Sequence, residues 1–292
     1  MIDAFSNTHN ASINVVLGTA QLDPTYGVMR NYAAIERPCD FLEEAWKLGI
    51  RTLDTAPGYG TAQAVIGRCG WSGHLHTKIP GRSDAVGSLT ASLKELGVSK
   101  ADVVYFHDSD VLNMGAEYIS DAHRAVVPRF AKRLGVSVYD PEEFRRCLDI
   151  PALKAIQAPM SVADQRISDQ LLHEAEARGV SVFARSVFLQ GALLGNKKEL
   201  PQHLERLIPT LDQLDVLTEK TGFSIVELLI AGVIFRPGLS GLVLGADSVT
   251  HLREIVASVQ QAKKVPRDVI EALRELEVHD RELIDPRRWP AN

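Results

Sequence analysis

Four ionisable residues have types and spacings that suit carbonyl chemistry. Asp54 and Tyr59 stand five positions apart in the segment GIRTLDTAPGYGTAQAVIG, while Lys78 and His107 come at or near the ends of two later apolar runs. A phenol with an ordinary pKa of ~10 can shuttle a proton when a nearby ammonium stabilises its phenolate. We therefore interpret Tyr59 as the proton donor and Lys78 as the ammonium that tunes it. Asp54 would keep the lysine charged and oriented, and His107 would hold the substrate oxygen as charge develops on it.

Each of these residues also has a purely structural interpretation. An Asp at the end of a strand usually caps a turn or joins an ion pair, and a Tyr in a Pro-Gly turn usually packs against its neighbours. The joint pattern is what favours chemistry, because all four residues fall where apolar runs end. The elements that carry these runs therefore decide whether the four side chains meet.

One alternation is repeated eight times along the chain, and each repeat begins with an apolar run short enough for a buried strand. These runs occupy residues 13–18, 50–54, 75–79, 103–107, 134–138, 154–158, 180–185 and 241–245. Segments with helical spacing of apolar residues lie between them, for example at 39–49, 83–97 and 168–179. Several of these segments open on Ser or Asp and close on Gly, as helices do.

This alternation predicts a single α/β domain over residues 1–292. Strand-helix repetition with right-handed crossovers builds a parallel sheet, and eight such units in 292 residues fit a closed (β/α)₈ TIM barrel better than an open doubly wound sheet. Active sites of this fold lie where strands end and loops begin, so the four ionisable residues would converge on one mouth. A longer insertion at 189–207, after the seventh strand, is predicted to be a loop at the same face.

Composition and charge exclude several function classes. The net charge is −5 and no Lys/Arg run is longer than two, so we expect no nucleic-acid partner. Residues 1–12 lack a basic segment followed by an apolar core. The most apolar run, at 224–235, is too short to span a membrane and contains Glu227. We therefore expect a cytoplasmic protein with no membrane partner.

Neither a disulfide framework nor a metal site is predicted. Cys39, Cys69 and Cys147 are odd in number and widely spaced, and we interpret them as reduced packing residues. His74 and His76 would share one face of a strand, but no carboxylate or cysteine stands close in sequence to complete a ligand set.

Two other cofactor motifs are absent. The Gly-Tyr-Gly at 58–60 looks like the start of a dinucleotide fingerprint, but Gln63 stands where the third glycine belongs, so no Rossmann motif is predicted. The Tyr-x-x-x-Lys pair that the short-chain reductases use is missing at all six tyrosines.

Eight motifs occur in order between about residue 15 and residue 256: LGTAQ, GIRTLDTAPGYG, HTK, VVYFHD, LGVSVYDPEEF, AIQAPMS, SVFARSVFLQGALLG and GLVLGADSVTHLREI. This ordered set resembles the aldo-keto reductases. The resemblance implies a (β/α)₈ barrel with a nicotinamide dinucleotide extended across its mouth, a hydride passing to a carbonyl, and a tyrosine supplying the proton. Asp54, Tyr59, Lys78 and His107 then fall on the catalytic tetrad of the family, each in its matching motif.

The resemblance also implies a cofactor-binding set. Its members follow the strand ends: Gly18, Thr19, Ser137, Gln157, Arg185, Ser186, Gln190, Gly191, Gly245, Ala246, Asp247, Ser248, His251, Arg253 and Glu254. Many family members have Ser-Asn where this chain has Ser137-Val138, so one side-chain hydrogen bond to the nicotinamide carboxamide is missing. Gln157 remains to make the other hydrogen bond. Arg185 replaces the aromatic residue that commonly stacks on the nicotinamide, and its guanidinium could stack instead or grip an anion. The form ARSVFLQG resembles a bacterial subgroup often associated with carbohydrate and secondary metabolism.

The segment GADSVTHLREI, residues 245–255, bears on which dinucleotide binds. Relatives that prefer NADP place cationic or hydroxyl side chains here, whereas Asp247 would repel a phosphate and could accept from the hydroxyls of an NAD ribose. The backbone N–H groups of this helix N-terminus still favour an anion, and Arg253 could reach it. We predict NADP(H) by a small margin, with NAD(H) as the alternative.

The predicted function is reduction of an aldehyde or ketone by an NAD(P)H-dependent aldo-keto reductase. The stretches KIPGRSD and HDSDVL are small and polar where the family often has bulky aromatics, so Asp108 and Asp110 are candidate partners of a sugar-derived or other polar carbonyl compound. Both aspartates could equally cap the following loop and face solvent. The alternative function is a non-catalytic, cofactor-binding regulatory protein on the same fold. The sequence predicts no particular oligomeric state or physiological substrate.

Overall fold

The computed structural model describes residues 13–23, 35–81, 84–194 and 197–290. The prediction made from residues 1–12 lies outside the described residues, as do Arg82 and Ser83 of the segment expected to border the substrate.

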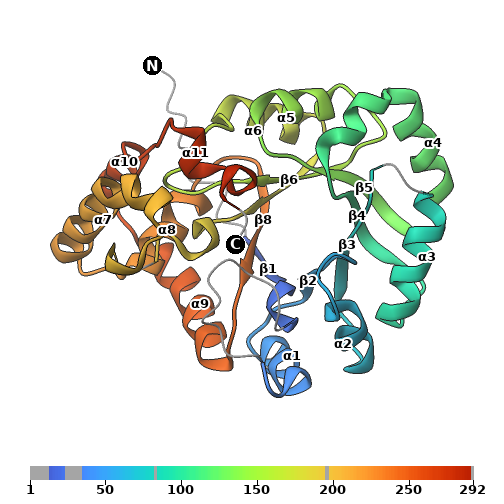
Figure 1. Ribbon diagram of the computed structural model, residues 1–292, viewed down its shortest axis with the longest axis horizontal. Coiled ribbons are helices and arrows are strands. Elements are labelled where there is room, and N and C mark those ends of the chain that lie inside the picture. Colours follow the sequence, from blue (N-terminus) through green and yellow to red (C-terminus); the bar gives the residue numbers. More distant parts are fainter. Residues whose placement is uncertain (1–12, 24–34, 82–83, 195–196, 291–292) are drawn as a thin grey trace.

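The described residues form a closed barrel of eight parallel strands that pair in the order of the sequence (Figure 1). The strands are β1 (Asn14–Gly18), β2 (Thr52–Asp54), β3 (His74–Ile79), β4 (Ala101–Phe106), β5 (Ala131–Ser137), β6 (Ala155–Pro159), β7 (Ser181–Arg185) and β8 (Leu239–Gly245). Each predicted apolar run forms one of them, so the (β/α)₈ barrel is confirmed. Pairing of β1 with both β2 and β8 closes the ring.

Helices surround the strands (Figure 1). They are α1 (Pro38–Lys47), α2 (Ala62–Arg68), α3 (Ala85–Leu96), α4 (Ala116–Val126), α5 (Pro141–Leu148), α6 (Asp169–Ala177), α7 (Ile208–Thr221), α8 (Ile225–Ile234), α9 (Val249–Ala262), α10 (Arg267–Arg274) and α11 (Arg281–Ile284). Their ends follow the expected signals. The Asp84 side chain caps α3 and Ser168 caps α6, while Gly97 ends α3 with a left-handed φ of 69°.

The insertion after β7 is not a plain loop. Its described residues include three short 3₁₀ helices, η3 (Leu189–Gly191), η4 (Lys197–Glu199) and η5 (Gln202–Leu207), before α7 begins. Apolar residues explain this partial order, because Leu189, Leu204 and Leu207 are buried. The insertion follows the carboxyl end of β7, as predicted.

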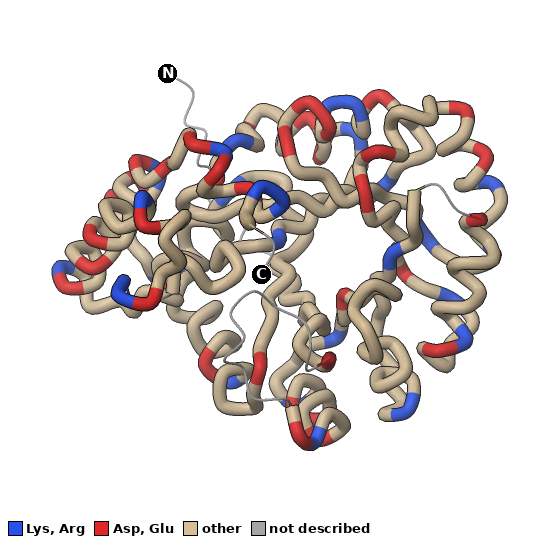
Figure 2. The backbone as a smooth tube through the Cα atoms, in the orientation of Figure 1, with Lys and Arg blue, Asp and Glu red and all other residues tan. Residues whose placement is uncertain are grey.

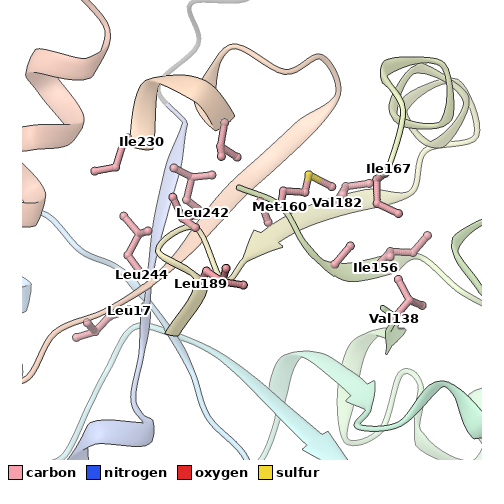
Figure 3. Packing of buried hydrophobic residues seen from close by; sticks show 14 of the residues in the cluster. Leu17, Val138, Ile156, Met160, Ile167, Val182, Leu189, Ile230, Leu242 and Leu244 are labelled. Atoms are coloured by element: carbon pink, nitrogen blue, oxygen red, sulfur yellow. The ribbon is translucent and has the colours of Figure 1, made fainter. Parts of the chain in front are cut away.

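Two apolar layers hold the barrel together. The larger layer lies between strands and helices, where Leu17 of β1 and Leu244 of β8 are register partners and Ile230 of α8 packs in the same cluster (Figure 3). The smaller layer fills the barrel interior and includes Tyr105 and Phe183. Burial on both faces explains why the strands read as continuous apolar runs instead of alternating ones.

Charged residues are concentrated on the helices and connecting segments around the barrel (Figure 2). Among the described residues, no helix combines the length and the apolar character that crossing a membrane requires, and the apolar α8 covers only Ile225–Ile234.

The prediction that all three cysteines are reduced was wrong. Cys39 near the start of α1 and Cys69 at the end of α2 form a disulfide, with their Cα atoms 5.1 Å apart. The two residues are 30 positions apart in sequence, and only the packing of α1 beside α2 brings them together. Cys147 is free and buried, and burial raises the pKa of its thiol.

Candidate active site

Three neighbouring strands position the four predicted catalytic residues. Asp54 is the last residue of β2, Lys78 is next to last in β3, and His107 follows β4 directly. Tyr59 lies in the turn between β2 and α2. Since parallel strands of a closed barrel end at one face, this order brings the four side chains to the same mouth.

Asp54 and Lys78 form a buried ion pair at the base of this mouth. The Lys78 Nζ lies 2.6 Å from Asp54 Oδ2 and also donates to the Thr55 carbonyl at 3.2 Å. Gln157 donates its Nε2 to Asp54 Oδ1 at 2.8 Å, and because β6 is not a neighbour of β2, this bond crosses the barrel interior. Burial disfavours the ammonium, but Asp54 and Tyr59 outweigh it and raise the pKa of Lys78. The lysine is therefore cationic at neutral pH.

The Tyr59 ring lies above this pair. The Lys78 Nζ is 4.9 Å from the ring centroid, and a hydrogen bond between the two side chains contributes to the raised lysine pKa. Backbone bonds from Tyr59 N to Ala56 O and from Ala62 N to Tyr59 O hold the turn. The Lys78 ammonium and the Tyr59 side chain are therefore in direct contact.

His107 faces Tyr59 across the mouth. Their ring centroids are 6.1 Å apart and the rings are nearly perpendicular, at 88°. Burial, followed by the Lys78 charge, lowers the pKa of His107. The imidazole is therefore neutral near pH 7, and its N–H can donate to an oxygen that approaches Tyr59.

Asp23 is a supporting residue that the sequence reasoning missed. It follows the short 3₁₀ helix η1 (Ala20–Leu22) after β1, is buried, and accepts from the Thr61 N–H at 2.8 Å and the Thr61 hydroxyl at 3.1 Å. It also fills the space beside Gly60, where an added Cβ would lie 2.0 Å from Asp23 Oδ2. The carboxylate thus anchors the turn that carries Tyr59. No motif identifies it, since its partner is 38 residues away.

A double-mutant cycle tests this anchor. Gly60→Ala should be destabilising because its φ of +54° disfavours a side chain and the new Cβ would meet Asp23. Asp23→Ala alone should also be destabilising because it removes the acceptor of the Thr61 amide. The double variant should lose less unfolding free energy than the sum of the singles, by about 0.5–3 kcal/mol, because the clash disappears. Urea unfolding measures all three, and strictly additive losses would show that the two residues do not meet.

Four of the residues predicted to bind the cofactor, Gly18, Thr19, Ser137 and Gln157, lie in or directly after β1, β5 and β6. Ser137 and Gln157 are buried register partners, and the Gln157 amide already donates one N–H to Asp54. Thr19 donates its hydroxyl to the Asp54 carbonyl at 2.9 Å, next to Gly18 at the end of β1. Thr19 and Gln157 therefore position Asp54 in addition to any contact with a ligand.

The predicted dinucleotide segment forms the end of β8 and the start of α9. Ser248 caps α9 by accepting from the His251 N–H, and Asp247 lies 3.1 Å from the His251 ring. Arg253 is 2.8 Å from Glu44 of α1, so its guanidinium is engaged on the outer surface. The remaining predicted members of this segment are Gly245, Ala246 and Glu254, with Gly245 ending β8.

The segment after β7 has an unusual backbone. Among the described residues, the non-glycine residues with positive φ are Ser186 at 60°, Leu189 at 48° and Gln190 at 52°, directly before Gly191. Such conformations cost about 1–3 kcal/mol each and cluster at ligand sites. This strain is compatible with the ligand-binding role predicted for Ser186, Gln190 and Gly191.

The structure places Arg185 on an aromatic ring of the protein itself. Its guanidinium carbon is 4.1 Å from the Tyr139 ring centroid, and it donates to the Val138 carbonyl at 3.0 Å and the Ser186 hydroxyl at 3.2 Å. Asp108 and Asp110, on the β4 side, are both exposed, and Asp108 makes no capping hydrogen bond with the 3₁₀ helix η2 (Ser109–Met114).

The two histidines of β3 have different environments. His74 is exposed and lies 3.0 Å from Asp102, whereas His76 is buried in the barrel interior, where its ring centroid is 4.8 Å from that of Phe183. Burial lowers the pKa of His76 to about 4. In the part of the chain that the structure describes, no three His, Cys, Asp or Glu side chains form a group that could hold a metal ion.

Comparison with known proteins agrees with this architecture. Residues 14–278 match the Aldo/keto reductase family. The chain is 24% identical over 266 residues to an NADH-specific methylglyoxal reductase of Escherichia coli (strain K12), covering 75% of this chain and 82% of that enzyme. It is also 24% identical over 292 residues to a Schizosaccharomyces pombe protein provisionally named a voltage-gated potassium channel subunit beta, covering 83% and 84% of the two chains.

A solved structure shares the fold. A Pseudomonas aeruginosa protein, provisionally named an aldo-keto reductase, superposes with a TM-score of 0.62 at 18% identity and covers 85% of this chain and 90% of its own. The family match extends from β1 to beyond α10, and therefore across the whole barrel. The chain belongs to the aldo/keto reductase family.

Proposed function

We propose that this protein is an NAD(P)H-dependent reductase that converts a polar aldehyde or ketone into an alcohol, with Tyr59 as the proton donor. The observation that supports this most strongly is the Asp54–Lys78–Tyr59 arrangement, with a 2.6 Å buried ion pair directly below a phenol ring. Aldo-keto reductases are oxidoreductases that bind nicotinamide cofactors and act on small molecules, so family membership agrees with the chemistry of the site.

The donor set of the mouth fits a nicotinamide dinucleotide. Ser137 and Gln157 offer hydroxyl and amide groups for a carboxamide, and the first turn of α9 offers backbone N–H groups for a phosphate. When bound, the dinucleotide supplies the hydride. The protein's own residues must then bind the carbonyl oxygen and deliver a proton to it.

Proton delivery follows from the charges of the mouth. As a hydride adds to the carbonyl carbon, the electron pair of the C=O π bond moves onto the oxygen. That oxygen takes the proton from the Tyr59 hydroxyl, and Lys78 stabilises the phenolate that remains. The neutral His107 donates a hydrogen bond to the same oxygen, and water later returns a proton to Tyr59. Asp54 keeps Lys78 charged throughout.

The substrate is expected to be polar. Asp108 and Asp110 follow β4 and are exposed, so carboxylates and not bulky apolar side chains follow the end of this strand. Stopped-flow loss of cofactor absorbance with a panel of carbonyl compounds tests both activity and preference. Hydroxylated aldehydes should have higher kcat/KM values than bulky apolar aldehydes of similar reactivity, and a clear reversal of that order would contradict the polar pocket.

A non-catalytic role remains the second candidate, and one observation favours it. The S. pombe relative is named for a channel subunit, so similarity to this chain extends beyond named enzymes. If this chain has such a role, it should bind the cofactor but should not oxidise it with any carbonyl compound of the panel.

The choice of dinucleotide depends on Asp247. Its carboxylate lies beside the start of α9, where it would repel a phosphate, and Arg253 is already paired with Glu44. One relative is named NADH-specific. The binding free energies of NADH and NADPH should therefore differ by no more than about 1–2 kcal/mol. Asp247→Asn removes the negative charge and should shift the preference toward NADPH. Fluorescence titration with both reduced cofactors measures this for each protein. A wild-type preference for NADPH above about a hundredfold would contradict this role of Asp247.

A further inference from the structure

Two arginines contact one tyrosine ring beside the mouth. Tyr139 lies two residues beyond the end of β5, Arg185 ends β7, and Arg287 belongs to the C-terminal 3₁₀ helix η6 (Pro286–Arg288). The guanidinium carbons of Arg185 and Arg287 are 4.1 and 3.7 Å from the Tyr139 ring centroid. Stacking of this kind fixes the plane of a guanidinium group.

Strand geometry places Arg185 on the mouth side of the barrel. Phe183 of the same strand points into the interior, where its ring contacts that of His76. Side chains two residues apart on a strand share a face, so Arg185 stands one layer nearer the carboxyl end than Phe183. After burial and the Lys78 charge, the Arg185 charge also contributes to the lowered pKa of His107. Arg185 and His107 therefore share one electrostatic environment.

Arg185 differs from Arg287 and Arg166 in that no carboxylate neutralises its charge among the described residues. Arg287 holds both oxygens of Asp285 at 2.9 and 2.6 Å, and Arg166 holds both oxygens of Asp164 at 2.8 Å. Arg185 has only neutral hydrogen-bond partners, and no described carboxylate lies within 4.0 Å of its guanidinium nitrogens. The mouth thus contains a half-buried cation whose charge the described protein groups do not neutralise.

A guanidinium in this state suits an anionic ligand. It has five N–H donors, and its hydrogen bonds to the Val138 carbonyl and the Ser186 hydroxyl leave others for a carboxylate or phosphate. Its orientation is already fixed by Tyr139, so little side-chain entropy is lost on binding. The positive φ of Ser186 shows that the backbone next to it is held in a strained conformation, as at other ligand sites.

We propose that Arg185, supported by Tyr139, is an anion-binding site that selects carbonyl substrates bearing a carboxylate or phosphate group. This inference rests on the proposed function and narrows its substrate class. It is compatible with the acidic side of the mouth, because hydroxyl groups of such a substrate can donate to Asp108 and Asp110 while its anionic end lies at Arg185.

Matched substrate pairs test the proposal. Succinic semialdehyde is compared with butanal, and glyceraldehyde phosphate with glyceraldehyde, in the wild type and in Arg185→Gln and Arg185→Lys. The measured quantity is the ratio of kcat/KM for the anionic member to that for the neutral member, which cancels any general loss of activity. The ratio should fall about 10- to 100-fold in Arg185→Gln and fall less in Arg185→Lys, which keeps the charge.

Arg287→Gln is the matched control. It removes the other guanidinium on Tyr139, whose charge Asp285 already neutralises, so the ratio should stay within about threefold of the wild-type ratio. An unchanged ratio in Arg185→Gln, or an equal fall in both variants, would overturn the proposal.

A phosphate of the dinucleotide is the other anion that could meet Arg185, and cofactor titration separates the two. If the cofactor uses this site, Arg185→Gln raises the Kd of NADH about tenfold or more while the substrate ratio stays unchanged, and the substrate proposal is wrong.

A binding measurement covers the case in which the wild type reduces no carbonyl compound. Protein loaded with cofactor is titrated with γ-hydroxybutyrate and with butanol, and cofactor fluorescence reports binding without turnover. The proposal predicts that the wild type binds γ-hydroxybutyrate at least tenfold more tightly than butanol and that Arg185→Gln abolishes this difference. Equal binding of both compounds by the wild type would refute the anion site, whereas absence of turnover alone would refute only the proposed function.

Discussion

Replacing Lys78 with methionine is expected to destabilise the protein by about 3–5 kcal/mol and to abolish measurable turnover. The stability loss follows from burial, because Lys78 and Asp54 are only 1% and 2% exposed. The substitution leaves a buried carboxylate whose remaining side-chain partner, among the described residues, is the Gln157 amide. The loss of turnover follows from the missing ammonium, without which the Tyr59 phenolate is not stabilised. Urea unfolding and a steady-state assay measure the two effects separately.

Two control variants make this result specific. Lys132→Met breaks a solvent-exposed ion pair with Asp102 and should cost no more than about 1 kcal/mol. The double variant Asp54→Leu with Lys78→Met removes both charges and should recover part of the lost stability but none of the activity. If Lys78→Met is no more destabilising than Lys132→Met, the pair does not have the buried character described above.

Tyr59→Phe should lower kcat by about 10²-fold or more, with the Kd of the reduced cofactor largely unchanged. The substitution keeps the ring 4.9 Å from Lys78 Nζ but removes the hydroxyl that would protonate the carbonyl oxygen. Stopped-flow absorbance under single-turnover conditions reports the chemical step, and fluorescence titration reports cofactor binding.

Tyr118→Phe provides the matched control. Its hydroxyl donates from α4 to the Gly81 carbonyl in the β3–α3 connection and has no assigned part in proton transfer, so its loss should change kcat by no more than a few-fold. A Tyr59→Phe enzyme with near wild-type turnover would show that another group protonates the carbonyl oxygen.

The sequence predicted the barrel well because its strands are buried on both faces and its helices have clear ends. Each apolar run found in the sequence became a strand, with boundaries within about three residues, and caps such as Asp84 and Ser168 stand where Ser and Asp opened helical segments. Strands and helix ends depend mainly on residues close together in the sequence, so a single sequence is enough to predict them. The strand ends then indicated that Asp54, Lys78 and His107 would share one mouth.

Contacts between segments distant in sequence could not be predicted in the same way. The Cys39–Cys69 disulfide depends on the packing of α1 against α2, and the hydrogen bonds that Thr61 donates to Asp23 join residues that follow different strands. The stacking of Arg185 on Tyr139 likewise requires the ends of β5 and β7 to approach. Each of these depends on side-chain packing in three dimensions, for which spacing in a single sequence contains no signal.

Transfer of deuterium from the cofactor to the substrate tests the central claim most directly. Wild-type protein is mixed with reduced cofactor deuterated at the transferable position of the nicotinamide ring and with a hydroxylated or anionic aldehyde, and the product is analysed by NMR. Carbonyl reduction at the mouth predicts an alcohol with deuterium on the former carbonyl carbon, and Tyr59→Phe should form it at least about 10²-fold more slowly. Cofactor that binds tightly but transfers no deuterium to any aldehyde would contradict the reductase assignment and favour the regulatory role.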